Sequence, residues 1–270
     1  MIFDTHAHYD DRAFDEDREE LLRSLPAGRI GRVVNIGSGL RACEQTIGLM
    51  EQYDYIYGAL GIHPSDTGEL TEENFEWLKG QCLAWKDRGK CVAVGEIGLD
   101  YYWNEPEPAV QQKWFRRQLS LARELSLPVV FHSRDAAKDT IDIMKEEKAE
   151  EIGGVIHCFS YTKETARTFL DMGYYIGIGG VLTFKNGKKL KEAAEYIPMD
   201  RIVLETDCPY LSPEPNRGKR NSSLNLPYVV QVLAQLKGIG EEEVERITWE
   251  NACRLYRMNA EPNNYNFCQK

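Results

Sequence analysis

Short apolar runs alternate with longer amphipathic stretches along most of this chain of 270 residues. Each apolar run is of strand length and ends in glycine or polar residues, whereas the stretches between them carry apolar residues at helical spacing. We expect strands that begin at residue 2 and then cover residues 32–36, 55–60, 91–95, 128–131, 154–156, 174–178 and 201–204. We expect helices up to residue 25 and over residues 41–53, 71–85, 110–125, 136–144, 162–172, 185–197, 226–236 and 241–256.

This order of elements predicts an α/β fold in a single domain. Strands that are each followed by a helix, in a unit of roughly thirty residues, are typical of a (β/α)₈ TIM barrel. We therefore predict a TIM barrel over residues 1–258 with extra C-terminal helices, and a flexible tail over residues 259–270. An open doubly wound sheet is the alternative, but no Gly-x-Gly-x-x-Gly sequence follows the first strand.

Composition narrows the classes of protein to consider. No apolar run approaches membrane-spanning length, so we expect no membrane partner. Asp4 and His6 stand where a signal peptide would need a basic start and an apolar core, so we expect no export. The seven cysteines are odd in number and form no C-x-x-C pair, which favours a reducing cytoplasm over a disulfide framework. A net charge of −10 argues against a nucleic-acid partner unless bound divalent ions or a local basic loop reverse the field.

The histidines give the first indication of a functional site. All of them fall at or just past the end of an expected strand: His6, His8, His63, His132 and His157. In a strand, residues two apart point to the same face, so the imidazoles of His6 and His8 converge. A single histidine is more often structural, and a lone His-x-His is weak evidence for a metal. The coincidence of all the histidines with strand ends instead predicts one site at the barrel mouth.

Barrel closure divides the expected ligands into two clusters. One cluster combines Asp207 with His6 and His8, because the eighth strand pairs with the first. The other contains residues of the adjacent fourth, fifth and sixth strands: Glu96, His132 and His157. These ligand types suit zinc, manganese or magnesium. Two ions about 4 Å apart need a shared ligand, for which Glu96 is the candidate. Glu205 competes with Asp207 but lies one layer deeper, so we favour Asp207 as the ligand and Glu205 as its support.

Six short motifs occur in one order along the chain. They are Asp4-Thr5-His6-Ala7-His8, Gly61-Ile62-His63-Pro64, Gly95-Glu96-Ile97-Gly98-Leu99-Asp100, His132-Ser133-Arg134, His157-Cys158-Phe159-Ser160 and Glu205-Thr206-Asp207. In residues and spacing they resemble the TatD family of metal-dependent deoxyribonucleases, which belong to the amidohydrolase-like barrels. The resemblance extends to about Tyr256. It implies two divalent metal ions, the first on His6, His8, Glu96 and Asp207 and the second on Glu96, His132 and His157.

The resemblance also implies a substrate. Members of the family act as phosphodiesterases on DNA, including trimming of single strands from the 3′ end, and some relatives are linked to removing D-amino acids from mischarged tRNA. We therefore expect single-stranded DNA as the substrate of a 3′–5′ exonuclease. One departure from the family pattern follows Arg217-Gly218-Lys219-Arg220-Asn221, where residues 222–226 intervene before Pro227. We expect this insertion to lengthen a loop at the barrel mouth and to affect substrate selection.

Roles follow for the polar residues of the mouth. A water activated by divalent ions is the expected nucleophile, with Asp207 as the candidate general base and Glu96 as the shared catalytic ligand. His63 either donates to a phosphate oxygen or is a structural turn residue. Further phosphates have three candidate partners, any of which can instead be a solvated surface charge: Arg134, Arg217 and Lys219. Three aromatic residues suit either base stacking or packing of their own loop: Tyr101, Tyr102 and Trp103.

Two other functions fit the same ligands. Hydrolysis of an ester or amide, such as the ester of an aminoacyl-tRNA, would use the same hydroxide on a carbonyl group. A non-catalytic metal-binding protein would instead need a closed coordination shell, with no open position for water.

Overall fold

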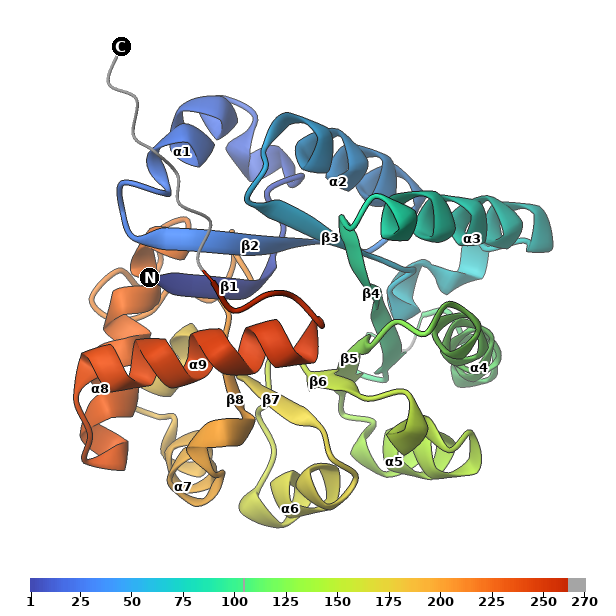
Figure 1. The fold of residues 1–270 in the computed structure, drawn as a ribbon. Coiled ribbons are helices and arrows are strands. Elements are labelled where there is room, and N and C mark those ends of the chain that lie inside the picture. The colour runs from blue at the N-terminus through green and yellow to red at the C-terminus, as the bar shows by residue number, and fades with distance from the viewer. Residues whose placement is uncertain (104, 262–270) are drawn as a thin grey trace.

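The computed structural model describes residues 1–103 and 105–261. Its strands form one parallel, eight-stranded sheet in the order of the chain, which confirms the predicted TIM barrel (Figure 1). The strands are β1 (Ile2–Ala7), β2 (Ile30–Gly37), β3 (Ile56–Leu60), β4 (Cys91–Asp100), β5 (Val129–Arg134), β6 (Gly154–Ile156), β7 (Tyr175–Ile178) and β8 (Ile202–Leu204).

The barrel closes between its first and last strands. Ala7 forms a parallel bridge with Cys208, and the backbone N–H of His8 donates to the carbonyl of Cys208 at 2.8 Å. The N–H of Asp207 donates to the carbonyl of His6 at 3.0 Å. The residues after β8 therefore lie beside the end of β1, as barrel closure predicts.

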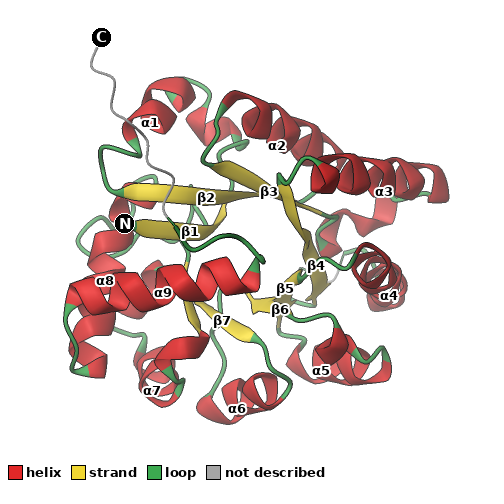
Figure 2. Cartoon of the chain, viewed as in Figure 1, coloured by secondary structure: helices red, strands yellow, loops and turns green. Residues whose placement is uncertain are grey.

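Helices surround the barrel on the outside (Figure 2). They are α1 (Arg18–Ser24), α2 (Leu40–Gln52), α3 (Glu72–Asp87), α4 (Pro108–Leu125), α5 (Ala137–Glu146), α6 (Lys163–Asp171), α7 (Lys188–Tyr196), α8 (Leu226–Lys237) and α9 (Glu241–Leu255). Thr71 caps α3 as predicted, because its hydroxyl accepts from the N–H of Asn74 at 3.2 Å. The apolar stripe of α4 packs against the barrel through Trp114 and Leu121, both buried.

The additional helix α9 covers the end of the barrel at which the strands begin (Figure 1). Trp249 and Tyr256 pack on Phe3, with ring centroids 5.6 and 6.0 Å apart. The Tyr256 hydroxyl donates to the carbonyl of Thr5 inside the barrel. This plug covers the end at which the strands begin, and the predicted ligands lie at the other end, where the strands finish.

The start of the predicted tail contacts the same end. The Arg32 guanidinium donates to the carbonyls of Asn259 and Glu261, and the Trp249 indole donates to that of Ala260. The rest of the predicted tail, residues 262–270, lies outside the described residues. Within the described residues, no helix combines the length and apolar character needed to cross a membrane.

Strand β4 is longer than its apolar run predicts. We expected it to end at residue 95, but it continues to Asp100. Gly95 and Gly98 interrupt the apolar pattern, yet the backbone stays paired with β5, where Gly98 lies opposite His132 and Asp100 opposite Arg134. Glu96 and Asp100 therefore belong to one strand, and their even spacing points both side chains to the same face.

Candidate metal centre

The ends of the strands surround a cavity of about 270 Å³. Its lining includes most of the ligands expected from the sequence: His8, Glu96, His132, His157 and Asp207. The remaining one, His6, is buried beside them, with its Nε2 3.1 Å from Nε2 of His8. The tertiary structure thus brings the two predicted clusters into direct contact.

Glu96 lies between the two clusters and is 3% exposed. Its Oε1 is 2.6 Å from Nδ1 of His132 and 3.6 Å from Nε2 of His157. Its Oε2 is 3.4 Å from Nε2 of His6 and 4.0 Å from Nε2 of His8. Burial raises the pKa of Glu96, but the charges of His157, His6 and His132 outweigh it and hold the pKa well below its ordinary range. Each oxygen of one ionised carboxylate therefore faces its own pair of imidazoles.

Around His6 and His8 the donor atoms have the spacing of a metal site. Nδ1 of His8 donates to the carbonyl of Ile36 at 3.1 Å, which turns Nε2 toward the cavity. Oδ1 of Asp207 lies 3.6 Å from Nε2 of His6 and 3.4 Å from Nε2 of His8. Donor atoms held about 2.1 Å from a tetrahedral ion are about 3.4 Å from one another. The residues present therefore fit a divalent cation.

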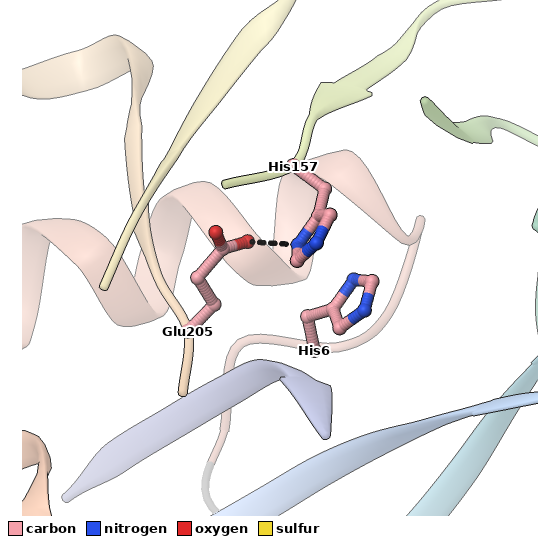
Figure 3. A group of neighbouring side chains, drawn as sticks. All are labelled: His6, His157 and Glu205. Carbon is pink, nitrogen blue, oxygen red and sulfur yellow. Dashed lines mark ion pairs between the residues drawn. The ribbon is translucent and has the colours of Figure 1, made fainter. Parts of the chain in front are cut away.

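His157 stacks on His6 and pairs with Glu205, the residue directly after β8 (Figure 3). The two rings are 3.5 Å apart at 14°, and Oε2 of Glu205 lies 3.3 Å from Nδ1 of His157. Oε1 of Glu205 accepts from the N–H of Cys158 at 2.6 Å. Gly177 on β7 leaves room for this carboxylate, since a Cβ there would lie 2.2 Å from it. Glu205 thus lies beneath the site rather than in its opening, as its depth in the strand predicts.

The carboxylates make this part of the barrel attractive to cations. Burial lowers the pKa of His8, but the hydrogen bond to Asp207 and its charge raise it to about 9. Burial likewise lowers the pKa of His157, but the charges of Glu205 and Glu96 raise it to about 10. Nδ1 of His6 is buried without a hydrogen-bond partner, whereas Nδ1 of His157 faces Oε2 of Glu205 as an ion pair. The raised pKa values of His8 and His157 show that the neighbouring carboxylates favour a positive charge at this position, as a cation site requires.

Asp100 is a functional candidate that the sequence reasoning missed. Its Oδ2 lies 3.0 Å from Nε2 of His132, so it accepts the proton of that nitrogen and turns Nδ1 toward Glu96. Gln111 holds the backbone of Asp100 from α4, accepting from its N–H and donating to its carbonyl. A carboxylate behind a histidine is the usual arrangement that orients a metal ligand. The even spacing of Glu96 and Asp100 along β4 was the signal that could have found it.

His63 lines the cavity with a defined tautomer. Its Nδ1 accepts from the N–H of Ser65 at 3.2 Å and lies 2.6 Å from the Ser65 hydroxyl. Its ring lies edge to face with His132, with centroids 4.3 Å apart. Burial and the neighbouring His132 lower the pKa of His63 to about 3, so the ring is neutral and carries its proton on Nε2.

The three predicted phosphate-binding cations stand outside the cavity. The described residues that line it include none of them. The Arg134 guanidinium lies 3.8 Å over the ring of Tyr102, and that of Arg217 lies 3.6 Å over the ring of Phe184. Lys219 is exposed in the segment that follows β8. The structure brings the ligands together but leaves these cations at the periphery.

The segment 222–226 differs from the longer mouth loop that we expected. It contains the 3-10 helix η6 (Ser223–Asn225) and leads directly into α8. The buried Ser223 hydroxyl donates to Oδ2 of Asp4 at 2.6 Å, and the Thr206 hydroxyl donates to the same oxygen at 2.7 Å. The segment packs under the first ligand cluster because Asp4, buried on β1, needs these donors.

Comparison with known proteins agrees with this site. The sequence model of a family described as TatD related DNase matches residues 3–257. A Bacillus subtilis protein named "uncharacterized metal-dependent hydrolase YabD" is 44% identical over 259 residues, which cover 96% of this chain and 100% of that protein. A Cronobacter sakazakii protein named "3'-5' ssDNA/RNA exonuclease TatD" is 33% identical over 267 residues, covering 97% of this chain and 100% of the relative.

A solved structure has the same architecture. The crystal structure of YjjV, a TatD homologue from Escherichia coli K12, superposes with a TM-score of 0.87 at 29% identity, covering 96% of this chain and 98% of that one. The family match spans nearly the whole described barrel and includes every candidate ligand. The chain therefore belongs to the TatD family of metal-dependent hydrolases.

Proposed function

We propose that this protein is a divalent-metal-dependent phosphodiesterase that hydrolyses DNA, acting as a 3′–5′ exonuclease on single strands. The observation that carries the proposal is the position of Glu96, whose two oxygens face two different sets of imidazoles within one cavity. A carboxylate shared between two ligand sets suits a two-metal hydrolase, a class that includes nucleases and other phosphodiesterases. The name of the Cronobacter sakazakii relative supports the same substrate class.

Two groups of residues would hold the ions. His6, His8, Glu96 and Asp207 would hold the first, and Glu96, His132 and His157 the second. When bound, zinc, manganese or magnesium makes hydroxide available near neutral pH and neutralises charge on a phosphate.

Asp207 is the proposed general base. It is the more accessible of the two ligand carboxylates, with 19% of its side chain exposed against 4% for Glu96. Burial raises its pKa, but the charges of His157, His6 and His8 and the hydrogen bond to His8 lower it below its ordinary value, so it is ionised at neutral pH. An ionised carboxylate at the edge of the cavity can take the proton of an attacking water and release it to solvent.

His63 is the proposed donor to the scissile phosphate. Its Nε2 carries the proton, and the ring stays neutral across the physiological range because the pKa lies near 3. A neutral N–H stabilises a developing negative oxygen without a change in its own protonation. The peripheral cations Arg134, Arg217 and Lys219 would contact phosphates farther along the strand, which offsets the net charge of −10 locally.

The free thiols support the cytoplasm as the proposed compartment. Within the described residues, Cys43, Cys82, Cys91, Cys158, Cys208 and Cys253 are all unpaired. A reducing compartment keeps thiols in this state.

The test is a metal-dependent activity panel on purified protein. Chelation should abolish release of nucleotides from a single-stranded oligonucleotide, and zinc, manganese or magnesium should restore it. Glu96→Gln should lower turnover by at least about 100-fold while circular dichroism shows an intact fold, because the shared charge at the centre of the site is lost. The matched control Glu124→Gln removes a partly exposed carboxylate that pairs with Lys79 on the helical surface and should change nothing.

Two results would contradict the proposal. One is full DNA cleavage by Glu96→Gln in the presence of metal. The other is turnover of a mischarged tRNA or a small ester by the wild-type enzyme with no activity on DNA, which would move the activity to carbonyl chemistry.

A further inference from the structure

Two large aromatic side chains stand exposed beside the metal centre. Tyr102 is 54% exposed and Trp103 is 64% exposed, although most large apolar side chains of the described chain are buried. Their rings are perpendicular, with centroids 5.0 Å apart. Exposing a tyrosine and a tryptophan together leaves apolar surface in water, which is typical of a binding surface.

The loop that carries these rings is tied to the metal centre through one carboxylate. Oδ1 of Asp100 accepts from the backbone N–H of Tyr102 at 3.0 Å and from that of Trp103 at 3.4 Å. Oδ2 of the same carboxylate lies 3.0 Å from Nε2 of His132. The two aromatic residues are therefore placed relative to His132 by a single buried group, and they cannot move far from the cavity while these bonds persist.

Arg134 completes this surface from β5. Its guanidinium lies 3.8 Å over the ring of Tyr102, two residues after His132 along the strand. Within residues 1–103 and 105–261, no carboxylate forms an ion pair with Arg134. A stacked guanidinium keeps its N–H groups free at the rim, so Arg134 can donate to a phosphate while its face covers the tyrosine.

The side of the cavity formed by the segments that follow β1, β2 and β3 has the wrong charge for a nucleic acid. There the cavity adjoins a hollow of about 610 Å³ near the start of α2, and Asp10, Asp11 and Asp66 line both. Glu69 adds a further carboxylate to this wall. Its carboxylates outnumber the cationic side chains among its described lining residues, which are Arg12 and Arg41. Phosphates are repelled by such a wall, so a strand bound in the cavity leaves it toward Arg134.

We propose that Tyr102, Trp103 and Arg134 form a binding site for the unpaired nucleobase next to the phosphate held in the cavity, with Trp103 as the stacking surface. This proposal rests on the proposed function and adds how the enzyme selects single strands. A base within a duplex is stacked on both faces and cannot lie on an indole, whereas the base of a single strand can. Because every base has a stacking face, the site tolerates any sequence.

Substitution of Trp103 tests the stacking surface with holoenzyme. Loss of one base–aromatic stack corresponds to about a 5-fold to 150-fold loss of affinity. We expect Trp103→Ala to raise KM for a single-stranded oligonucleotide within this range with little change in kcat, and Trp103→Phe to restore most of the loss. Tyr196→Ala is the matched control, because Tyr196 is also an exposed aromatic (47%) but ends α7 at the opposite end of the barrel.

A substrate without bases identifies the contact. For the wild-type enzyme, KM should rise by the same factor on an oligonucleotide whose two 3′-terminal nucleotides are abasic. On that substrate, Trp103→Ala should raise KM no further. Two results would overturn the stacking site. One is an equal KM of Trp103→Ala and wild type on the base-bearing substrate, and the other is a rise in KM from Trp103→Ala that adds to the rise from removing the bases.

Binding of a fluorescent phosphorothioate oligonucleotide, measured by anisotropy with metal present, separates this inference from the proposed function. Base-dependent and Trp103-dependent binding without cleavage of any DNA would refute the nuclease activity and keep the stacking site. Cleavage of DNA, together with an affinity that is the same with or without the bases and with or without Trp103, would refute the stacking site alone. The absence of both binding and cleavage would refute the two together.

Discussion

Asp100→Asn isolates the effect of orienting His132. Asp100 is 2% exposed, and its Oδ2 accepts from Nε2 of His132 at 3.0 Å. Asparagine has the same size and keeps one oxygen to accept from the N–H groups of Tyr102 and Trp103, but it then turns an amide donor toward the N–H of His132. Two donors cannot bond to each other, so His132 loses the partner that fixes its ring. Loss of such a partner costs about 10-fold to 100-fold in metal affinity or activity, equivalent to about 1.4 to 2.7 kcal/mol.

The assay for Asp100→Asn is a metal titration followed by both calorimetry and turnover. We expect one of two ions to bind 10-fold to 100-fold more weakly, and kcat/KM at limiting metal to fall by the same factor and recover as metal is added. Circular dichroism should match wild type. Asp142→Asn, an exposed partner of Lys138 on α5, is the control and should titrate like wild type. Wild-type affinity for both ions together with wild-type turnover in Asp100→Asn would refute the role of Asp100 in orienting His132.

Two predictions concern stability. The ions bind the ligand cluster only when the protein is folded. Metal at about 100 times its Kd should therefore stabilise the protein by about 2.7 kcal/mol and raise Tm by roughly 5 to 10 °C relative to protein treated with chelator. An unchanged Tm in calorimetry would argue against a metal site. Burial raises the pKa of the Cys43 thiol from 9.0 to about 12, so above pH 9 the thiol ionises only in the unfolded state and stability falls by up to about 1.4 kcal/mol per pH unit. Cys43→Ala should flatten this slope in urea unfolding between pH 9 and 11, and an unchanged slope would contradict the assignment.

Local patterns account for much of the site. Apolar runs of strand length locate the strand ends, and the barrel brings those ends to one rim. Because side chains alternate along a strand, the spacing of His6 and His8 already places both on one face. Closure between β1 and β8 follows from the element order, and with it the position of Asp207. These features depend on the periodicity of the backbone, which can be recognised from a short stretch of sequence.

Backbone periodicity did not predict where β4 ends. Gly95 and Gly98 lack apolar side chains, so the hydrophobic pattern stops before the strand does. Pairing with β5 continues the backbone ladder to Asp100, and strand pairing is a long-range interaction that periodicity does not contain. The role of Asp100 beside His132 was missed for this reason.

The side-chain directions in the loops were also decided by tertiary packing. Arg134 and Arg217 each stack on an aromatic ring contributed by another segment, a contact that their own sequence neighbourhood does not indicate, and their role as phosphate ligands stays a prediction. Ser223 lies in a segment that looked like an insertion at the mouth, yet it is buried because Asp4, more than 200 residues earlier in the chain, needs its hydroxyl. The sequence by itself determined the element order and the ligands that the strands present, since both depend on alternation along the backbone. Only the tertiary structure decided which polar groups support those ligands, because a buried donor or acceptor takes its partner from whatever segment the fold places beside it.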